Sequence, residues 1–262
     1  KSDFNAIAAK SISTSNRTFW LGLDSTTGAL SLKASSGGVA HVCSVIGTTD
    51  LRSKGWVYVT GVHSTSSCSV YVNGVLEGID STAGTPEGVG ASLYVGRDTG
   101  ATARDFNGSI DELAIWNTSL TGDEILKIYN RQNTKFGGLY TSSITATPVS
   151  SSWTNFKWLS SLPFYKEFPG DTNADATPDS ESSAEYSGVS ASSGQNLELL
   201  WHLNESSWVN PNYDAIDSSG KNRPGVSGTG TISSAVGKLK GAANLNVANN
   251  RIQSAGFDLG AI

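Results

Sequence analysis

Residues 106–116 read Phe-Asn-Gly-Ser-Ile-Asp-Glu-Leu-Ala-Ile-Trp, and this stretch indicates the fold class. From Ile110 to Trp116 it has the length and the β-branched and aromatic content of a short strand. A strand is therefore predicted over 110–116, directly before the one helix that the sequence indicates.

That helix begins at a capping box, Thr121-Gly-Asp-Glu124, with Thr121 as N-cap and Glu124 at the third helical position. Apolar side chains then follow at helical spacing, at Ile125, Ile128 and Tyr129. Leu120 lies just before the cap and is placed to pack on Ile125 as a hydrophobic staple. The pattern predicts a helix over 122–131.

Short strands separated by turns fill the rest of the first 118 residues. One turn, Asn73-Gly74, suits a tight hairpin because both residues tolerate positive φ. Regular short strands with such turns predict a sandwich or a barrel. The expected strands cover residues 6–9, 18–23, 29–32, 39–46, 56–60, 69–72, 93–95 and 110–116.

Composition excludes several classes of protein. The chain has 18 Lys and Arg against 23 Asp and Glu, a net charge of −5 that argues against nucleic-acid binding. It contains no run of about 18 apolar residues, so no membrane-spanning helix is predicted. Its 29 Gly and its low charged content of 16% are typical of an all-β chain. Because the chain starts at Lys1 and has no Met, we expect a processed product or part of a longer protein.

The second half of the chain divides into two segments. Residues 133–196 contain two alternating stretches, 139–145 and 153–159, then a Ser-, Asp- and Gly-rich run, and predict a small β connector and a linker. Strand character returns at Leu197-Glu-Leu-Leu-Trp-His-Leu203 and recurs near 242–247 and 251–253.

Five pieces of the first 132 residues form an ordered set: Trp56-Val-Tyr-Val59, Val70-Tyr-Val-Asn-Gly74, Leu93-Tyr-Val-Gly96, residues 106–116, and residues 120–129. Together they resemble the second half of a laminin-G-like domain, of the concanavalin A-like lectin/glucanase type. The resemblance implies an all-β jelly-roll sandwich with one short helix and a small β connector.

The first half of such a domain resembles the C-terminal segment instead. The matching pieces are Leu199-Leu-Trp-His-Leu-Asn-Glu205, Asp217-Ser-Ser-Gly220, residues 237–243 and Arg251-Ile252. The chain therefore divides into a second half (1–132), a connector (133–196) and a first half (197–262). Because neither half can bury its sheet alone, residues 197–262 should pack on a copy of 1–132. That copy belongs to the next repeat of a tandem array, to another molecule, or, in a circular permutant, to the same chain; the array is the favoured alternative.

An enzyme is not expected. Glycoside hydrolysis usually needs two carboxyl groups flanking one bond. Asp111 and Glu112 are adjacent on the predicted strand, so they should point to opposite faces. The histidines His41, His63 and His202 lie in strand-like runs and form no recognisable nucleophilic motif.

The resemblance implies a calcium site at one end of the sandwich, because related domains often hold that ion. Its candidate ligands are Asp217, Asp214, Asp111 and Glu205. The alternative for Asp217 is an Asx turn, in which its side chain bonds nearby backbone. A weaker candidate resembles the start of an EF-hand loop, with Asp171, Asn173, Asp175 and Asp179 as ligands.

Sugar binding calls for aromatic rings beside polar loops. Trp208 and Tyr213 lie in a loop near the expected calcium site and are the candidate ligand-binding residues. The other tryptophans lie in predicted strands and are expected in the core: Trp20, Trp56, Trp116, Trp153, Trp158 and Trp201.

Cys43 and Cys68 are the only cysteines. If their strands are neighbours they can form a disulfide, which an exported chain permits. The alternative is two small buried thiols in a β core.

These observations predict a non-catalytic extracellular or cell-surface repeat. Its expected partners are glycans or cell-surface proteins, with calcium as a candidate cofactor and self-association or tandem packing between half-domains. The alternatives are a purely structural spacer and an accessory carbohydrate-binding domain of a glycan-active enzyme.

Overall fold

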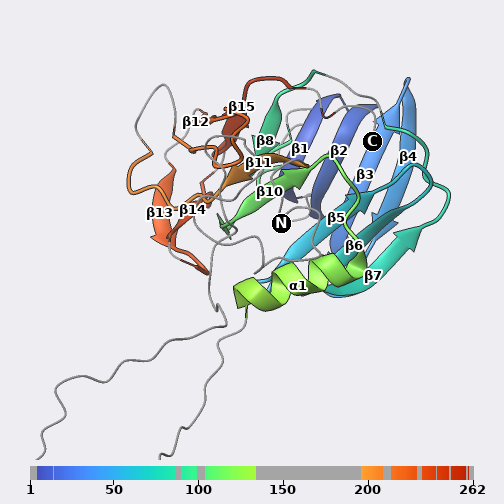
Figure 1. Cartoon of the computed structure of the whole chain (residues 1–262), viewed down its shortest axis with the longest axis horizontal. Helices are drawn as coiled ribbons and strands as arrows, with labels where there is room; N and C mark the ends of the chain where they lie inside the picture. Colours follow the sequence, from blue (N-terminus) through green and yellow to red (C-terminus); the bar gives the residue numbers. More distant parts are fainter. Residues whose placement is uncertain are drawn as a thin grey trace, which may run out of the picture.

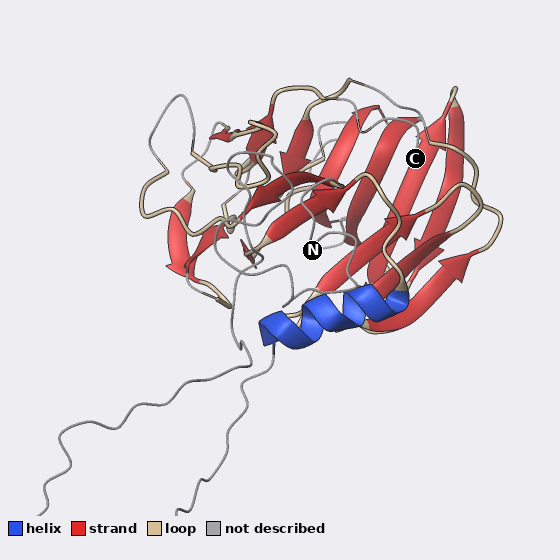
Figure 2. Ribbon diagram, in the orientation of Figure 1, coloured by secondary structure: helices blue, strands red, loops and turns tan. Residues whose placement is uncertain are grey.

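The structure is a computed structural model. It describes residues 5–13, 15–86, 90–98, 104–133, 196–208, 214–228, 232–239, 241–247, 249–257 and 259. The expected connector strands at 139–145 and 153–159 lie outside these residues. Among those described, the regular secondary structure is all strand except for one helix, as Figure 2 shows, and the all-β expectation is confirmed.

One layer is a seven-stranded antiparallel sheet with the order β12-β15-β8-β1-β2-β3-β4 (Figure 1). One end of this sheet is a meander of four long strands from the first 46 residues. The strands span Asn5–Ser13 (β1), Asn16–Leu23 (β2), Leu30–Ser36 (β3), Val39–Ile46 (β4), Leu93–Val95 (β8), Gly225–Ser227 (β12) and Ile252–Ser254 (β15).

The other layer consists of three smaller sheets, with the orders β5-β6-β7, β10-β11 and β13-β14-β9. Its strands span Val59–His63 (β5), Cys68–Val72 (β6), Val75–Asp80 (β7), Ser109–Ile110 (β9), Leu113–Trp116 (β10), Leu197–Trp201 (β11), Ser233–Val236 (β13) and Gly241–Asn244 (β14). The Asn73-Gly74 turn joins β6 to β7 with φ of 51° and 79°, which confirms the predicted hairpin.

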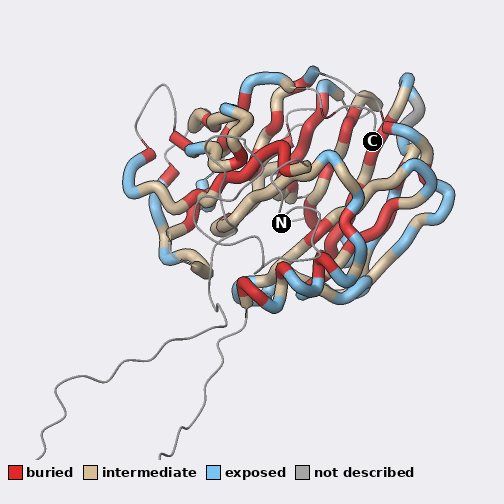
Figure 3. The backbone as a smooth tube through the Cα atoms, viewed as in Figure 1, coloured by how far each residue is buried: buried red, intermediate tan, exposed pale blue. Residues whose placement is uncertain are grey.

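The two segments expected to be half-domains pair with each other within this one chain. β10 pairs with β11, placing Leu113 opposite Trp201. β8 pairs with β15, and β9 pairs with β14. The largest core cluster combines buried side chains from both segments, and β11 is buried along its whole length (Figure 3). The tandem array stays a prediction.

Helix α1 spans Gly122–Asn133 and lies beside the second layer (Figure 1). Both hydrogen bonds of the capping box are present: Glu124 N–H donates to Thr121 Oγ1 at 3.3 Å, and Thr121 N–H donates to Glu124 Oε2 at 2.8 Å. Leu120, Ile125 and Ile128 are buried in one cluster with β11. The helix is therefore fixed by its cap at one end and by an apolar stripe along its length.

Cys43 and Cys68 form a disulfide with a Cα–Cα distance of 6.1 Å. The structure thus contains the first of the two alternatives for these residues. The two strands, β4 and β6, are not neighbours in one sheet, as the sequence argument assumed, but lie in the two different layers. The bond therefore ties the sandwich together across its interior.

Replacing both cysteines by serine should lower the free energy of unfolding by about 3 kcal/mol, because the bond closes a loop of 25 residues in the unfolded chain. Urea denaturation of the double variant against the native protein measures this loss. A native protein that loses no stability in reducing agent would contradict the assignment.

Candidate ligand-binding site

Three aromatic side chains gather where the segment before β5 meets the end of α1. The tryptophan, Trp56, is 42% exposed. The rings of Tyr58 and Tyr129 lie 5.9 Å apart between centroids, inclined at 39°. With their neighbours they form a shallow depression of about 70 Å³, which we call the aromatic groove. It is lined by Trp56, Val57, Tyr58, Asp111, Glu112, Tyr129, Gln132, Asn133, Lys238 and Leu239.

The β6–β7 hairpin holds Tyr58 in place. Asn73 N–H donates to the Tyr58 carbonyl at 2.8 Å, and the Asn73 side-chain oxygen accepts from Tyr58 N–H at 3.0 Å. Burial raises the pKa of the Tyr58 phenol to about 12. The phenol therefore stays neutral at physiological pH, and it forms a hydrogen bond with the side chain of Thr60.

The last turn of α1 brings amide groups to the groove. Asn133 Nδ2 donates to the Tyr129 hydroxyl at 2.7 Å, while Gln132 lies largely buried beside it. Lys238 comes from the C-terminal segment. The groove therefore combines aromatic, amide, carboxylate and ammonium groups, and both segments of the chain are needed to form it.

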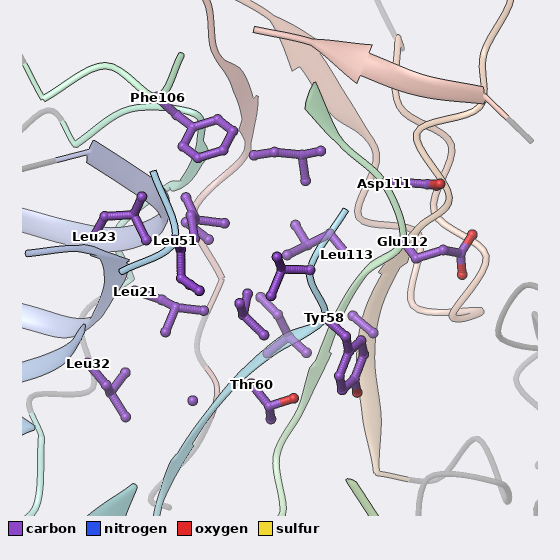
Figure 4. Close-up of a pocket in the computed structure, with 18 of the residues that line it drawn as sticks. Leu21, Leu23, Leu32, Leu51, Tyr58, Thr60, Phe106, Asp111, Glu112 and Leu113 are labelled. Carbon is purple, nitrogen blue, oxygen red and sulfur yellow. The ribbon is translucent and has the colours of Figure 1, made fainter. Parts of the chain in front are cut away.

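Asp111 and Glu112 form the acidic wall of the groove, and the expectation that they face opposite ways was wrong. They lie in a break between β9 and β10, where Glu112 has a φ of 54°. Strand alternation does not apply there, and Figure 4 shows both carboxylates directed to the same side. Asp111 Oδ2 accepts from Leu239 N–H at 3.0 Å. Glu112 Oε1 is 2.7 Å from His202 Nδ1, so each acid is bound to the C-terminal segment.

Trp56 was expected in the core, and this was also wrong. β5 begins three residues later than the predicted strand, at Val59, so Trp56 precedes the sheet and keeps an exposed face. The sequence carried one usable signal, the glycine at Gly55, because Lys54-Gly55 reads as a turn rather than as the start of a strand. Trp20 and Trp201 are buried as expected.

The side chain of Asp217, the first expected calcium ligand, accepts hydrogen bonds from backbone groups. Its Oδ1 accepts from Leu200 and Ser219 N–H at 3.1 and 3.0 Å. Its Oδ2 accepts from Arg223 N–H at 2.8 Å and from the Ser219 hydroxyl at 2.9 Å. Each donor places a positive hydrogen at an oxygen that calcium would need, which is the arrangement of the Asx-turn alternative.

Asp214 and Glu205 also bind backbone groups. Asp214 Oδ2 accepts from Ser227 N–H at 2.7 Å, and Glu205 Oε1 accepts from Ile216 N–H at 2.9 Å. Burial raises the pKa of Glu205, which disfavours its charged form. Within the described part of the chain, no three His, Cys, Asp or Glu side chains come together as a metal-binding group. Each of the four expected ligands thus accepts at least one backbone hydrogen bond, and calcium binding stays a prediction.

The remaining predicted residues are either buried or outside the described ranges. Trp208 is 6% exposed and packs in the main core cluster, and its indole N–H donates to Ser234 Oγ at 3.2 Å. It offers no open ring face to a ligand, since the loop folds it inward. Outside the described residues lie Tyr213, Asp171, Asn173, Asp175 and Asp179.

Comparison with known proteins agrees with this architecture. Residues 1–126 match the family model described as the concanavalin A-like lectin/glucanases superfamily, in its laminin-G form. No curated protein and no solved structure gave a match. No helix among the described residues is long and apolar enough to cross a membrane. The matched segment runs from the first strand of the meander into α1 and carries half of the residues that line the aromatic groove.

Proposed function

We propose that the protein is a non-catalytic carbohydrate-binding module and that the aromatic groove is its binding surface. The observation that carries the proposal is the exposed ring of Trp56 beside neutral tyrosine and amide groups. An aromatic ring offers a flat apolar surface to the C–H face of a sugar, and a few fixed polar groups then select its hydroxyls. The superfamily suggests carbohydrate or protein binding, and the groove favours carbohydrate.

The size of the groove suits surface recognition. Its volume of about 70 Å³ is far below that of a pocket that encloses a small molecule, roughly 300–1,000 Å³. A ligand would therefore lie across Trp56 with much of its surface in water. This favours the end or the side of a glycan chain over a fully enclosed monosaccharide.

Binding is proposed to be independent of calcium and of catalysis. The four candidate calcium ligands hold backbone or neighbouring side chains, as described above. Glu112 contacts the ring of His202, and Asp111 accepts a hydrogen bond from Leu239 N–H. Both acids therefore link residues 1–132 to the C-terminal segment. Laminin-G-like domains are generally binding modules.

An extracellular position fits the disulfide, because such bonds persist in oxidising compartments. We therefore propose a surface adhesin or fibre as the setting, with glycans or glycosylated cell-surface proteins as partners. The lectin-like fold supports this class of partner. A purely structural spacer is the alternative that a clean absence of binding would favour.

Trp56→Ala should abolish glycan binding, with a loss of at least tenfold in affinity, while leaving the fold intact. The reason is that the exposed ring supplies the stacking surface and few packing contacts. A glycan array probed with the native protein, followed by titration of the best glycan, measures the effect.

Ile216→Ala is the matched control, because Ile216 is 64% exposed and is not among the residues that line the groove. It should bind like the native protein, and chelator should change neither. Equal binding by Trp56→Ala and the native protein would show that the glycan binds at a different site. Loss of glycan binding in chelator would show that binding depends on calcium.

A further inference from the structure

Two asparagines in the chain are followed directly by glycine, in the pairs Asn73-Gly74 and Asn107-Gly108. In such a pair the glycine nitrogen can attack the asparagine side chain, because glycine has no Cβ to shield its own amide. Both asparagines are exposed, so solvent reaches each of them. The two sites differ in how firmly the asparagine side chain and the following amide are held.

Asn73 is held by the backbone of Tyr58. Its N–H donates to the Tyr58 carbonyl at 2.8 Å, and its side-chain oxygen accepts from Tyr58 N–H at 3.0 Å. It also lies in the tight turn between β6 and β7, with a φ of 51°. Attack by Gly74 would require the side chain to leave Tyr58 N–H without its partner, which costs free energy. The hairpin therefore protects Asn73.

Asn107 lies just before β9 and is not held in this way. Within the part of the chain that the structure describes, neither its carboxamide nor the Gly108 N–H forms a hydrogen bond. Segments with few hydrogen bonds open at little cost in free energy. The Asn107 side chain can therefore turn toward the Gly108 nitrogen without breaking an interaction.

The residue after Asn107 supports the seam between the two segments of the chain. The Gly108 carbonyl accepts from Leu245 N–H at 2.8 Å. β9 begins at the next residue and pairs with β14 of the C-terminal segment. Leu245 directly follows β14 and is fully buried in the main core cluster. A change of backbone length at position 107 would therefore act directly on this pairing.

We propose that Asn107 is a site of spontaneous deamidation, and that its conversion to isoaspartate loosens the seam between β9 and β14. The modification belongs to residue 107 and not to residue 73, although both asparagines are exposed and both precede glycine. The proposal does not depend on the glycan assignment, since Asn107 is not among the residues that line the aromatic groove.

The reaction consumes water and needs no other reactant. The Gly108 nitrogen loses its proton to hydroxide and attacks the side-chain carbonyl carbon of Asn107. A carbon–nitrogen bond forms to Gly108, the bond to the side-chain nitrogen breaks, and that nitrogen leaves as ammonia. Water then opens the cyclic imide at one of its two carbonyl groups. One opening gives aspartate and the other gives isoaspartate, and neither step is an oxidation or a reduction.

Isoaspartate changes the backbone, whereas aspartate does not. In isoaspartate the main chain runs through the side chain of residue 107, which adds one carbon atom before Gly108. Strand pairing depends on a fixed spacing between residues, so the added atom displaces the Gly108 carbonyl from Leu245 N–H. The hydrogen bond at the end of the β9–β14 pairing is then weakened or lost.

The test ages the whole native chain in mildly alkaline buffer and follows the Asn107 and Asn73 peptides by mass spectrometry after proteolysis. Asn107 should convert at least tenfold faster than Asn73. In the isoaspartate form, the Leu245 amide should exchange its hydrogen at least tenfold faster than in fresh protein, because its local opening costs less. Equal conversion at both asparagines, or isoaspartate at position 107 with unchanged exchange at Leu245, would overturn the proposal.

Two variants separate the chemistry from other effects of ageing. Asn107→Gln keeps a carboxamide but places it one carbon farther from the Gly108 nitrogen, so the aged variant should keep the slow exchange of Leu245. Asn107→Asp carries the charge of the product on an unchanged backbone, and the fresh variant should exchange at Leu245 like the fresh native protein. Fast exchange at Leu245 in either variant would overturn the proposal, because the lengthened backbone would then not be its cause.

Discussion

Replacing Asp98 by alanine should lower the free energy of unfolding by about 3–5 kcal/mol, the usual cost of removing one member of a buried ion pair. The Asp98 side chain is fully buried. Its carboxylate accepts from Ser11 Oγ at 3.0 Å, Arg17 Nη2 at 3.4 Å and Arg104 Nη1 at 3.2 Å. Arg17 is also buried, and this burial lowers the pKa of its guanidinium. Without the carboxylate, that charge would stay in the interior uncompensated.

Asp50→Ala is the matched control for this prediction. Asp50 pairs with Arg52 at 2.6 Å, but about half of each side chain is exposed. Such surface pairs contribute little to stability, because solvent screens them. Urea denaturation measures the free energy of unfolding of both variants. Equal losses of stability would contradict the claim that removal of Asp98 leaves the buried charge of Arg17 uncompensated.

The second large effect concerns Trp201, whose replacement by alanine should cost about 3–5 kcal/mol. Trp201 is fully buried on β11 and lies opposite Leu113 of β10. Its indole N–H donates to the Arg223 carbonyl at 2.9 Å. Its ring also packs tightly over Gly225, where a Cβ would come within 2.8 Å of the ring. The variant would lose this packing and leave a cavity at the seam between the two segments.

Chemical denaturation of Trp201→Ala tests this role, with Trp56→Ala as its counterpart. The two variants should separate cleanly: the first loses stability, and the second loses ligand binding with a stability change below about 1 kcal/mol. A Trp201→Ala protein as stable as the native one would mean that β11 does not pack against β10 in solution.

The sequence predicted the regular elements well because their local signals agree with their packing. Strand β4 and strand β8 have the predicted bounds, and α1 begins where its capping box places it. Strand β7 was not predicted from the sequence. Its apolar side chains Val75, Leu76 and Ile79 are exposed, so the strand lacks the alternation of buried apolar and exposed polar residues on which strand prediction relies. Motif order predicted that residues 197–262 pack on a copy of residues 1–132, but the pairing of β11 with β10 was not predicted, because no local signal specifies it.

The candidate site was harder to predict because tertiary context decides it. Trp56 and Trp208 exchanged their expected roles: the first lies outside the sheet, and the second is turned into the core. Nothing in a short polar loop such as Ser206-Ser-Trp208 shows which way its ring turns. Glu112 could not be placed either, because its φ of 54° breaks the strand alternation on which the sequence argument relied.

The most direct test of the proposed function is an NMR titration that follows the indole N–H signals of the seven tryptophans as the best glycan from the array is added. The account predicts that the Trp56 signal shifts most and that the buried Trp201 and Trp208 signals stay nearly unchanged. A shift confined to Trp208, or glycan binding that leaves Trp56 unmoved, would contradict the aromatic groove as the binding surface.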